Sequence, residues 1–153
     1  MRQATTPSLK HLLGLLLGLL LTPLLGSCVM GTLPPGFDDE QVQEGAQAII
    51  QLINREDANG LLAVSSPKMR ETLSTDILHK LAVARLKLGE YKEIQTITYQ
   101  TTQDEEGNPL ARATIQARYE AETVEYTIDF DEDMRLAGLI LTTSEGKTPE
   151  PAP

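Results

Sequence analysis

The sequence predicts an α+β domain in which helices come first and an antiparallel sheet of about four strands follows. Apolar residues repeat at helical spacing from residue 38 to residue 88, and they alternate at strand spacing after residue 109. Because the strand patterns follow one another without intervening helices, neighbouring strands can pair as a meander. One face of such a sheet packs against the helices.

The first helix is expected to begin after Asp38 or Asp39, either of which can cap it. Asn59-Gly60 marks the next break, and Leu61–Val64 suggests a short second helix. The apolar residues of the first helix fall on one stripe: Val42, Ala46, Ile49, Ile50 and Ile53.

Ser66-Pro67 is typical of a cap followed by proline at the first helical position, and Gly89 is a natural stop. Between them the pattern fits either one helix or two helices broken near Ser74. A single stripe through this region would contain Leu73, Ile77, Leu81, Ala84 and Leu88.

Four strands are expected in the second half of the chain. Tyr91–Thr102 is rich in Thr, Ile and Tyr, and residues 111–119 and 123–131 alternate between apolar and polar side chains. Arg135–Thr143 is the last strand, in which Gly138 can mark a bulge. Asp104–Pro109 and Asp131–Asp133 are the turns.

The two alternating strands predict a hairpin in which paired residue numbers sum to 243. That register places Arg118 opposite Glu125 and Arg112 opposite Asp131, and it sets small apolar residues against large ones. A sum of 241 places Arg112 opposite Asp129 but leaves Arg118 facing Thr123, so we prefer 243. The outer face of the sheet would then be neutralised by its own ion pairs.

The N-terminus has the organisation of an export signal. Residues 1–11 carry Arg2 and Lys10 and no acid, and Leu12–Leu25 is apolar. The following Leu25-Gly26-Ser27-Cys28 run resembles the bacterial lipobox, in which the cysteine thiol receives a diacylglycerol and a dedicated peptidase cuts just before that cysteine. We therefore expect a signal peptide at 1–27 and a lipid anchor on Cys28. The alternative is an uncleaved anchor helix, since about 20 apolar residues span a bilayer.

Behind Cys28 the chain divides into a spacer at 28–37, a folded domain at 38–143 and a proline-rich tail at 144–153 that is expected to be disordered. The formal net charge is −9, and it becomes −11 without residues 1–27. Such a surface argues against nucleic-acid binding and against electrostatic attraction to anionic lipid. A lipid-anchored chain of this kind belongs on the outer face of the cytoplasmic membrane, which is the cell surface in a Gram-positive organism.

Two segments carry a family resemblance. Leu88-Gly89 with Tyr91–Ile94, and the turn Phe130–Leu139, resemble the domain of unknown function common on secreted bacterial lipoproteins and allied to the nuclear transport factor two-like superfamily. The glycine that this turn usually carries in the family is absent here, and Met134 stands near its place. The resemblance implies a curved sheet wrapped on helices around a cone-shaped pocket, which is catalytic in some members and binds ligands or partners in others.

No catalytic or metal-binding set is predicted. His79 is expected on a helix surface, and no cofactor is implied. Asp129, Asp131 and Asp133 match the start of a calcium loop, but Met134 and Ile140 stand where that loop needs Gly and Glu. The candidates for pocket lining are the large rings, which fit an ordinary core equally well: Tyr91, Tyr99, Tyr119, Tyr126 and Phe130.

Three functions are consistent with these features. The first is a non-enzymatic module that binds a small ligand or an envelope protein. The second is an accessory subunit of an envelope complex. The third is a pocket enzyme of cyclase or isomerase type that uses a carboxylate such as Asp129 or Glu125.

Overall fold

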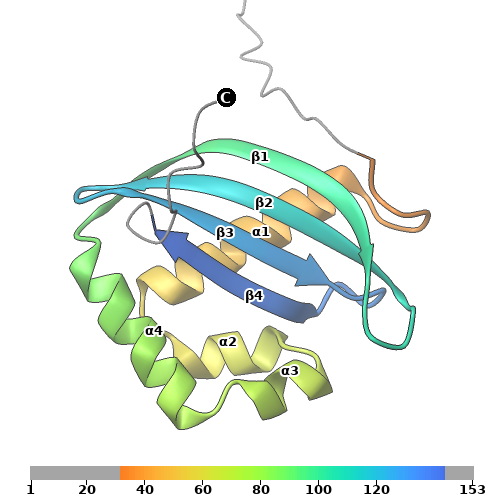
Figure 1. The fold of residues 1–153 in the computed structure, drawn as a ribbon, viewed down its shortest axis with the longest axis horizontal. Coiled ribbons are helices and arrows are strands. Elements are labelled where there is room, and N and C mark those ends of the chain that lie inside the picture. The colour runs from red at the N-terminus through yellow and green to blue at the C-terminus, as the bar shows by residue number, and fades with distance from the viewer. Residues whose placement is uncertain (1–31, 144–153) are drawn as a thin grey trace, which may run out of the picture.

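The structure is a computed structural model, and it describes residues 32–143 of the chain. Four helices precede a four-stranded sheet, which confirms the predicted α+β class (Figure 1). The predicted signal peptide, Ser27, Cys28 and the tail at 144–153 lie outside the described residues. The elements are α1 Asp39–Asn54, α2 Ala58–Val64, α3 Pro67–Thr72, α4 Thr75–Lys87, β1 Tyr91–Gln103, β2 Pro109–Tyr119, β3 Thr123–Phe130 and β4 Leu136–Thr143.

Helix α1 forms as predicted, because Asp38 accepts a hydrogen bond from the Gln41 backbone N–H and caps the first turn. Its whole apolar stripe is buried, and the helix lies across one face of the sheet (Figure 1). The chain then turns sharply at Glu56, whose φ of 56° is left-handed. Asp57 caps α2 by accepting the Gly60 N–H at 2.8 Å.

The segment from Pro67 to Leu88 forms two helices. Ser66 caps α3 and Ser74 caps α4, so the chain breaks at Leu73 and Ser74. This break changes the helical phase, and the single stripe expected here is therefore wrong in part. Leu73 and Leu88 are buried at the ends, but Ile77 is 40% exposed and no residue of α4 itself is buried.

The sheet is an antiparallel meander in the order β1-β2-β3-β4. It curves over α1, and its inner face forms the core with that helix (Figure 1). Ile115 of β2 and Tyr126 of β3 are fully buried on this face and lie opposite each other. Gly45 of α1 lets the Phe130 ring approach, since a Cβ atom there would lie 3.1 Å from the ring.

The predicted register between β2 and β3 is wrong. Paired residues sum to 241, which places Arg112 opposite Asp129 and Arg118 opposite Thr123. Arg118 finds its carboxylate on the other neighbouring strand, where Glu93 of β1 accepts a hydrogen bond at 2.9 Å. The prediction considered only the β2–β3 hairpin, in which Arg118 has no carboxylate partner at this register. In the complete sheet, Glu93 of β1 is that partner.

The expected neutralisation of the outer face therefore arises from other partners. Arg112 donates two hydrogen bonds to the Asp129 carboxylate, at 2.6 and 2.8 Å. Asp129 is a nearly buried residue, with 9% of its surface exposed. Gln116 donates to Glu125 beside it. Near Asp129 the pairing of β3 with β4 shifts at Gly138, as expected for a bulge.

The hairpin turns are stabilised by their own aspartates. Asp131 accepts backbone N–H bonds from Asp133 and Arg135, and Asp104 accepts them from Glu106 and Asn108. Met134, which stands near the place of the glycine usual in the resembling family, adopts a left-handed φ of 57°. These carboxylates are thus engaged within their turns.

Candidate binding groove

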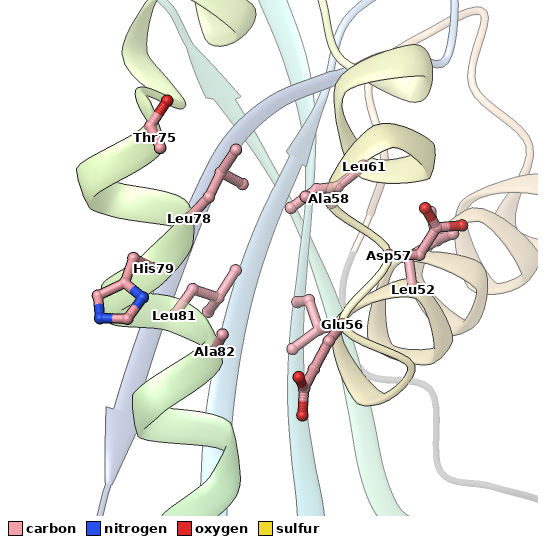
Figure 2. A pocket seen from close by; sticks show the side chains of 11 residues that line it. Leu52, Glu56, Asp57, Ala58, Leu61, Thr75, Leu78, His79, Leu81 and Ala82 are labelled. Atoms are coloured by element: carbon pink, nitrogen blue, oxygen red, sulfur yellow. The ribbon is translucent and has the colours of Figure 1, made fainter.

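An apolar groove of about 300 Å³ lies between the end of α1, the short helix α2 and helix α4 (Figure 2). It forms because the chain breaks at Ser74, and α4 then leaves a gap beside α2. The lining residues are Leu52, Ile53, Glu56, Asp57, Ala58, Leu61, Thr75, Leu78, His79, Leu81 and Ala82.

The two walls of the groove present aliphatic side chains to each other. Leu78 and Leu81 point from α4 toward α2, and Leu61 with Ala58 points back from α2 (Figure 2). Leu61 is 2% exposed and belongs to the core, whereas Leu78 and Leu81 are only partly buried. The groove is therefore an open extension of the hydrophobic core.

A carboxylate stands at one end of this row. Glu56 extends from the corner between α1 and α2 into the space between the helices (Figure 2). Its left-handed backbone is uncommon for a residue other than glycine, asparagine or aspartate, and such conformations cost about 1–3 kcal/mol. His79 also lines the groove from α4, and its side chain is exposed.

The predicted pocket residues lie elsewhere in the domain. Tyr91, Tyr119 and Tyr126 come together at one end of the inner face, where the rings of Tyr91 and Tyr119 meet edge to face at 5.6 Å. Tyr119 donates a hydrogen bond to Asn54 at 2.8 Å, so its oxygen accepts the proton of Tyr126 at 2.6 Å. This cluster ties α1 to β2 and β3.

Burial raises the pKa of both tyrosine hydroxyls at this hydrogen bond. The pKa of Tyr126 is raised first by burial and then by the bond it donates to Tyr119. Burial also raises the pKa of Tyr119, although the bonds to Tyr126 and Asn54 and the charge of Arg85 lower it in part. Both hydroxyls are therefore neutral at ordinary pH.

Arg85 of α4 closes this end of the domain. Its guanidinium lies 5.8 Å from the Tyr119 ring centre, within cation–π range, and donates to the Gly89 carbonyl at 2.8 Å. Within residues 32–143 its buried Nε atom has no hydrogen-bond partner. The contact holds the end of α4 against the sheet, while the beginning and middle of α4 line the groove.

Tyr99 and Phe130 are not part of this cluster. Tyr99 is 3% exposed, with its hydroxyl 3.4 Å from Gln43 of α1, and Phe130 packs on Gly45. Tyr91 borders a separate hollow between α1 and β1. None of the five predicted rings is among the residues that line the helical groove.

A larger hollow of about 640 Å³ lies between the two hairpin turns and α3. It is acidic, but Asp104 and Asp131 accept bonds from their own turns and Glu105 pairs with Lys68 at 2.8 Å. No group of three or more His, Cys, Asp or Glu side chains in the described part of the chain is arranged to hold a metal ion. Between residues 32 and 143, no helix has the length and apolar character needed to cross a membrane.

Sequence reasoning missed the groove for a definable reason. The expected stripe included Leu81, which lines the groove, but it ran through Ile77 and left out Leu78. Ser74 could have indicated the new helix and its change of phase, because a serine before an acidic first turn is typical of a helix cap.

The fold defines an α+β domain in which helices pack on a four-stranded meander and form an open groove between themselves. The chain belongs to the family described as protein of unknown function (DUF3887), which residues 46–139 match. It is also similar to the NMR structure of a protein from Ruminococcus gnavus ATCC 29149, with 26% identity and a TM-score of 0.64 over 71% of this chain and 94% of that one. No curated protein matches.

Proposed function

We propose that this protein is an exported lipoprotein, anchored by Cys28 to the outer face of the membrane, whose domain is a non-enzymatic binding module. The anchor is supported by the Leu25–Cys28 run at the end of an apolar stretch, and by the spacer that precedes the domain. The predicted alliance with the nuclear transport factor two-like superfamily is part of the proposal. The curved sheet over helices and the left-handed turn at Met134 support it.

The anchor can be tested by mass. We expect the mature protein to begin at Cys28 and to carry a diacylglyceryl group on that residue. Cys28→Ser should abolish lipid labelling and leave the precursor uncleaved at this site. A mature chain with an unmodified Cys28, or one that retains residues 1–27, would contradict the anchor without affecting the groove.

The binding role rests on one observation, the groove with an aliphatic floor and the Glu56 carboxylate at its end. Such a site recognises an apolar chain that ends in a cation, because the floor excludes water and the carboxylate selects charge. A partner peptide with a large aliphatic side chain beside a lysine or arginine has this chemistry. Asp129 is paired with Arg112 and is not among the residues that line the groove, so the carboxylate suggested for a pocket enzyme does not stand there.

The test uses octylammonium and octanoate as probes of opposite charge with the same chain. In a titration followed by amide NMR shifts, octylammonium should perturb the end of α1, α2 and the start of α4, and octanoate should bind more weakly. Leu81→Gln should weaken octylammonium binding, whereas Leu86→Gln on the exposed side of α4 is the matched control.

Glu56→Gln tests the charge separately from the floor. It should bring the affinities for the two probes together, and it should leave the fold intact because Glu56 is exposed. Equal perturbation by both probes in the wild-type protein, or shifts spread over the sheet, would overturn the groove as the binding site.

A further inference from the structure

The two edges of the sheet differ in how well they are protected against pairing with another strand. An edge strand leaves a row of backbone N–H and C=O groups unpaired, and proteins usually guard it with charges, prolines or bulges. β1 has two register shifts near its start and carries Lys92 and Glu93. β4, the other edge, has neither a charged residue nor a proline in its sequence LAGLILTT.

Only the beginning of β4 is covered. Ser65 forms an isolated bridge to Leu136, and the Ser66 N–H donates to the Leu136 carbonyl at 2.9 Å. Within residues 32–143, no other backbone hydrogen bond from outside the sheet reaches this strand. Among the residues that the structure describes, 138–143 therefore present an open edge.

This open edge is also apolar. Ile140 is 57% exposed on the outer face of the sheet. It is an apolar residue at a polar position, since Thr127 of β3 lies opposite it. Val64, next to the Ser65 bridge, is 40% exposed. A half-exposed isoleucine on a strand with open backbone groups is a ready pairing site.

We infer that β4 is the surface through which two copies of this chain associate, edge to edge and antiparallel, to form a continuous eight-stranded sheet. The occupant must be a strand, because only a strand satisfies a row of backbone groups. A second copy fits because the chain has a net charge of −9, and this uncharged edge is where two such molecules can meet without opposing like charges.

The two-fold symmetry restricts the register. Each inner-face residue must meet an inner-face residue of the partner copy, so paired numbers must sum to an even value. A sum of 280 centres the pair on Ile140, places Leu139 opposite Leu141 of the other copy, and buries the exposed isoleucine against its own equivalent. It also leaves the Ser65 and Ser66 contacts with Leu136 in place.

The area of such an interface is small, since it involves about one strand from each copy. We therefore expect weak association in dilute solution and stronger association when copies share a membrane, because tethering raises the effective concentration. The dependence on tethering rests on the proposed lipid anchor, whereas the pairing itself does not.

Cysteine cross-linking in membranes tests the pairing with the full chain. Cys28 is the only cysteine of the sequence, so the unsubstituted chain reports any background. Ile140→Cys should form a disulfide-linked dimer on mild oxidation, because directly opposed Cβ atoms lie within bonding reach. The matched control is Thr127→Cys, which lies opposite Ile140 on β3, one strand further from the edge.

We expect at least roughly tenfold more dimer from Ile140→Cys than from Thr127→Cys, and less dimer when the membranes are dissolved and diluted in detergent before oxidation. Dimer lost only after solubilisation still supports the pairing and identifies tethering as its cause. Equal cross-linking at both positions, or a product whose mass is not twice that of the chain, would overturn self-pairing.

A charge substitution gives an independent reading. Ile140→Lys places two like charges opposite each other and should abolish association of detergent-solubilised protein measured by sedimentation. Leu86→Lys, at a residue 65% exposed on α4, is the control and should leave association unchanged. Loss of association in both variants would argue against the β4 edge.

Discussion

Helices α1 and α4 look alike in sequence and differ in the folded domain. Both are capped by a polar residue and both carry several aliphatic side chains, over 16 and 13 residues respectively. α1 buries five apolar residues against the sheet, whereas α4 buries none. Ile77, Val83 and Leu86 of α4 are 40%, 39% and 65% exposed.

The difference separates the part of the domain that stabilises the fold from the part that can serve binding. The α1 stripe is continuous, so a single face meets the curved sheet along its length. α4 is attached at its ends by Leu73, Leu88 and the Arg85 contact, and its middle is free to form one wall of the groove. Regions with few buried contacts are the ones that open most easily.

The largest expected effect comes from truncating each helix in turn. Ile50→Ala removes a 1% exposed side chain of α1 and should lower the free energy of unfolding by about 2–5 kcal/mol. Leu86→Ala on α4 should change it by less than about 0.5 kcal/mol. Urea denaturation measures both, and similar losses would show that α4 is as firmly packed as α1.

The same contrast between covered and exposed groups exists in the ion pairs of the sheet. Arg112→Gln leaves the nearly buried Asp129 carboxylate without its partner and should cost about 2–3 kcal/mol. Arg118→Gln removes a pair whose side chains are 50% and 56% exposed and should cost about 0.5 kcal/mol or less. The matched substitutions are compared by denaturation at low salt, where a larger loss for Arg118 would contradict this ranking.

Alkaline pH tests the tyrosine cluster between the ends of α1 and α4. Because folding raises the pKa of Tyr119 and Tyr126 above the usual value of about 10, the folded state holds its protons longer than the unfolded state. Stability is therefore complete below that pH and is lost as pH rises beyond it. Tyr126→Phe should cost about 1 kcal/mol at pH 7 and flatten the alkaline loss.

The control for this prediction is the wild-type protein at pH 7 and pH 11, measured with the same denaturant. If Tyr126→Phe and wild type lose stability in parallel across that range, the tyrosine pair does not govern the alkaline limit.

The most local expected effect concerns the end of α4 alone. Gly89 has a φ of 73°, and a Cβ atom there would lie 3.0 Å from Glu120. Gly89→Ala should cost about 1 kcal/mol through left-handed strain. We expect faster amide hydrogen exchange in α4 and unchanged exchange in the middle of α1, whereas uniform acceleration would indicate that the two helices open together.

Several elements were predictable because their causes are local. The cap at Asp38, the α1 stripe, the break before Pro67 and the alternation in β2 and β3 each depend on residues a few positions apart. The bulge at Gly138 and the irregular turn at Met134 were also visible as departures from pattern. The phase of α4 was not, because a shift at Ser74 rotates every later residue about the helix axis.

The sequence by itself determined the fold class and the inner face of the sheet, since periodicity states which side chains can be buried together. Its other strong signal, the Leu25–Cys28 run, stays a prediction that the mass measurement addresses. Only the tertiary structure decided which partners meet. Arg118 pairs with Glu93 rather than Glu125, three of the five predicted rings gather while two do not, and Leu78 with Leu81 faces α2. The physical reason is that each of these choices is a competition among groups distant in sequence, and it is settled when all four strands and α1 pack at once.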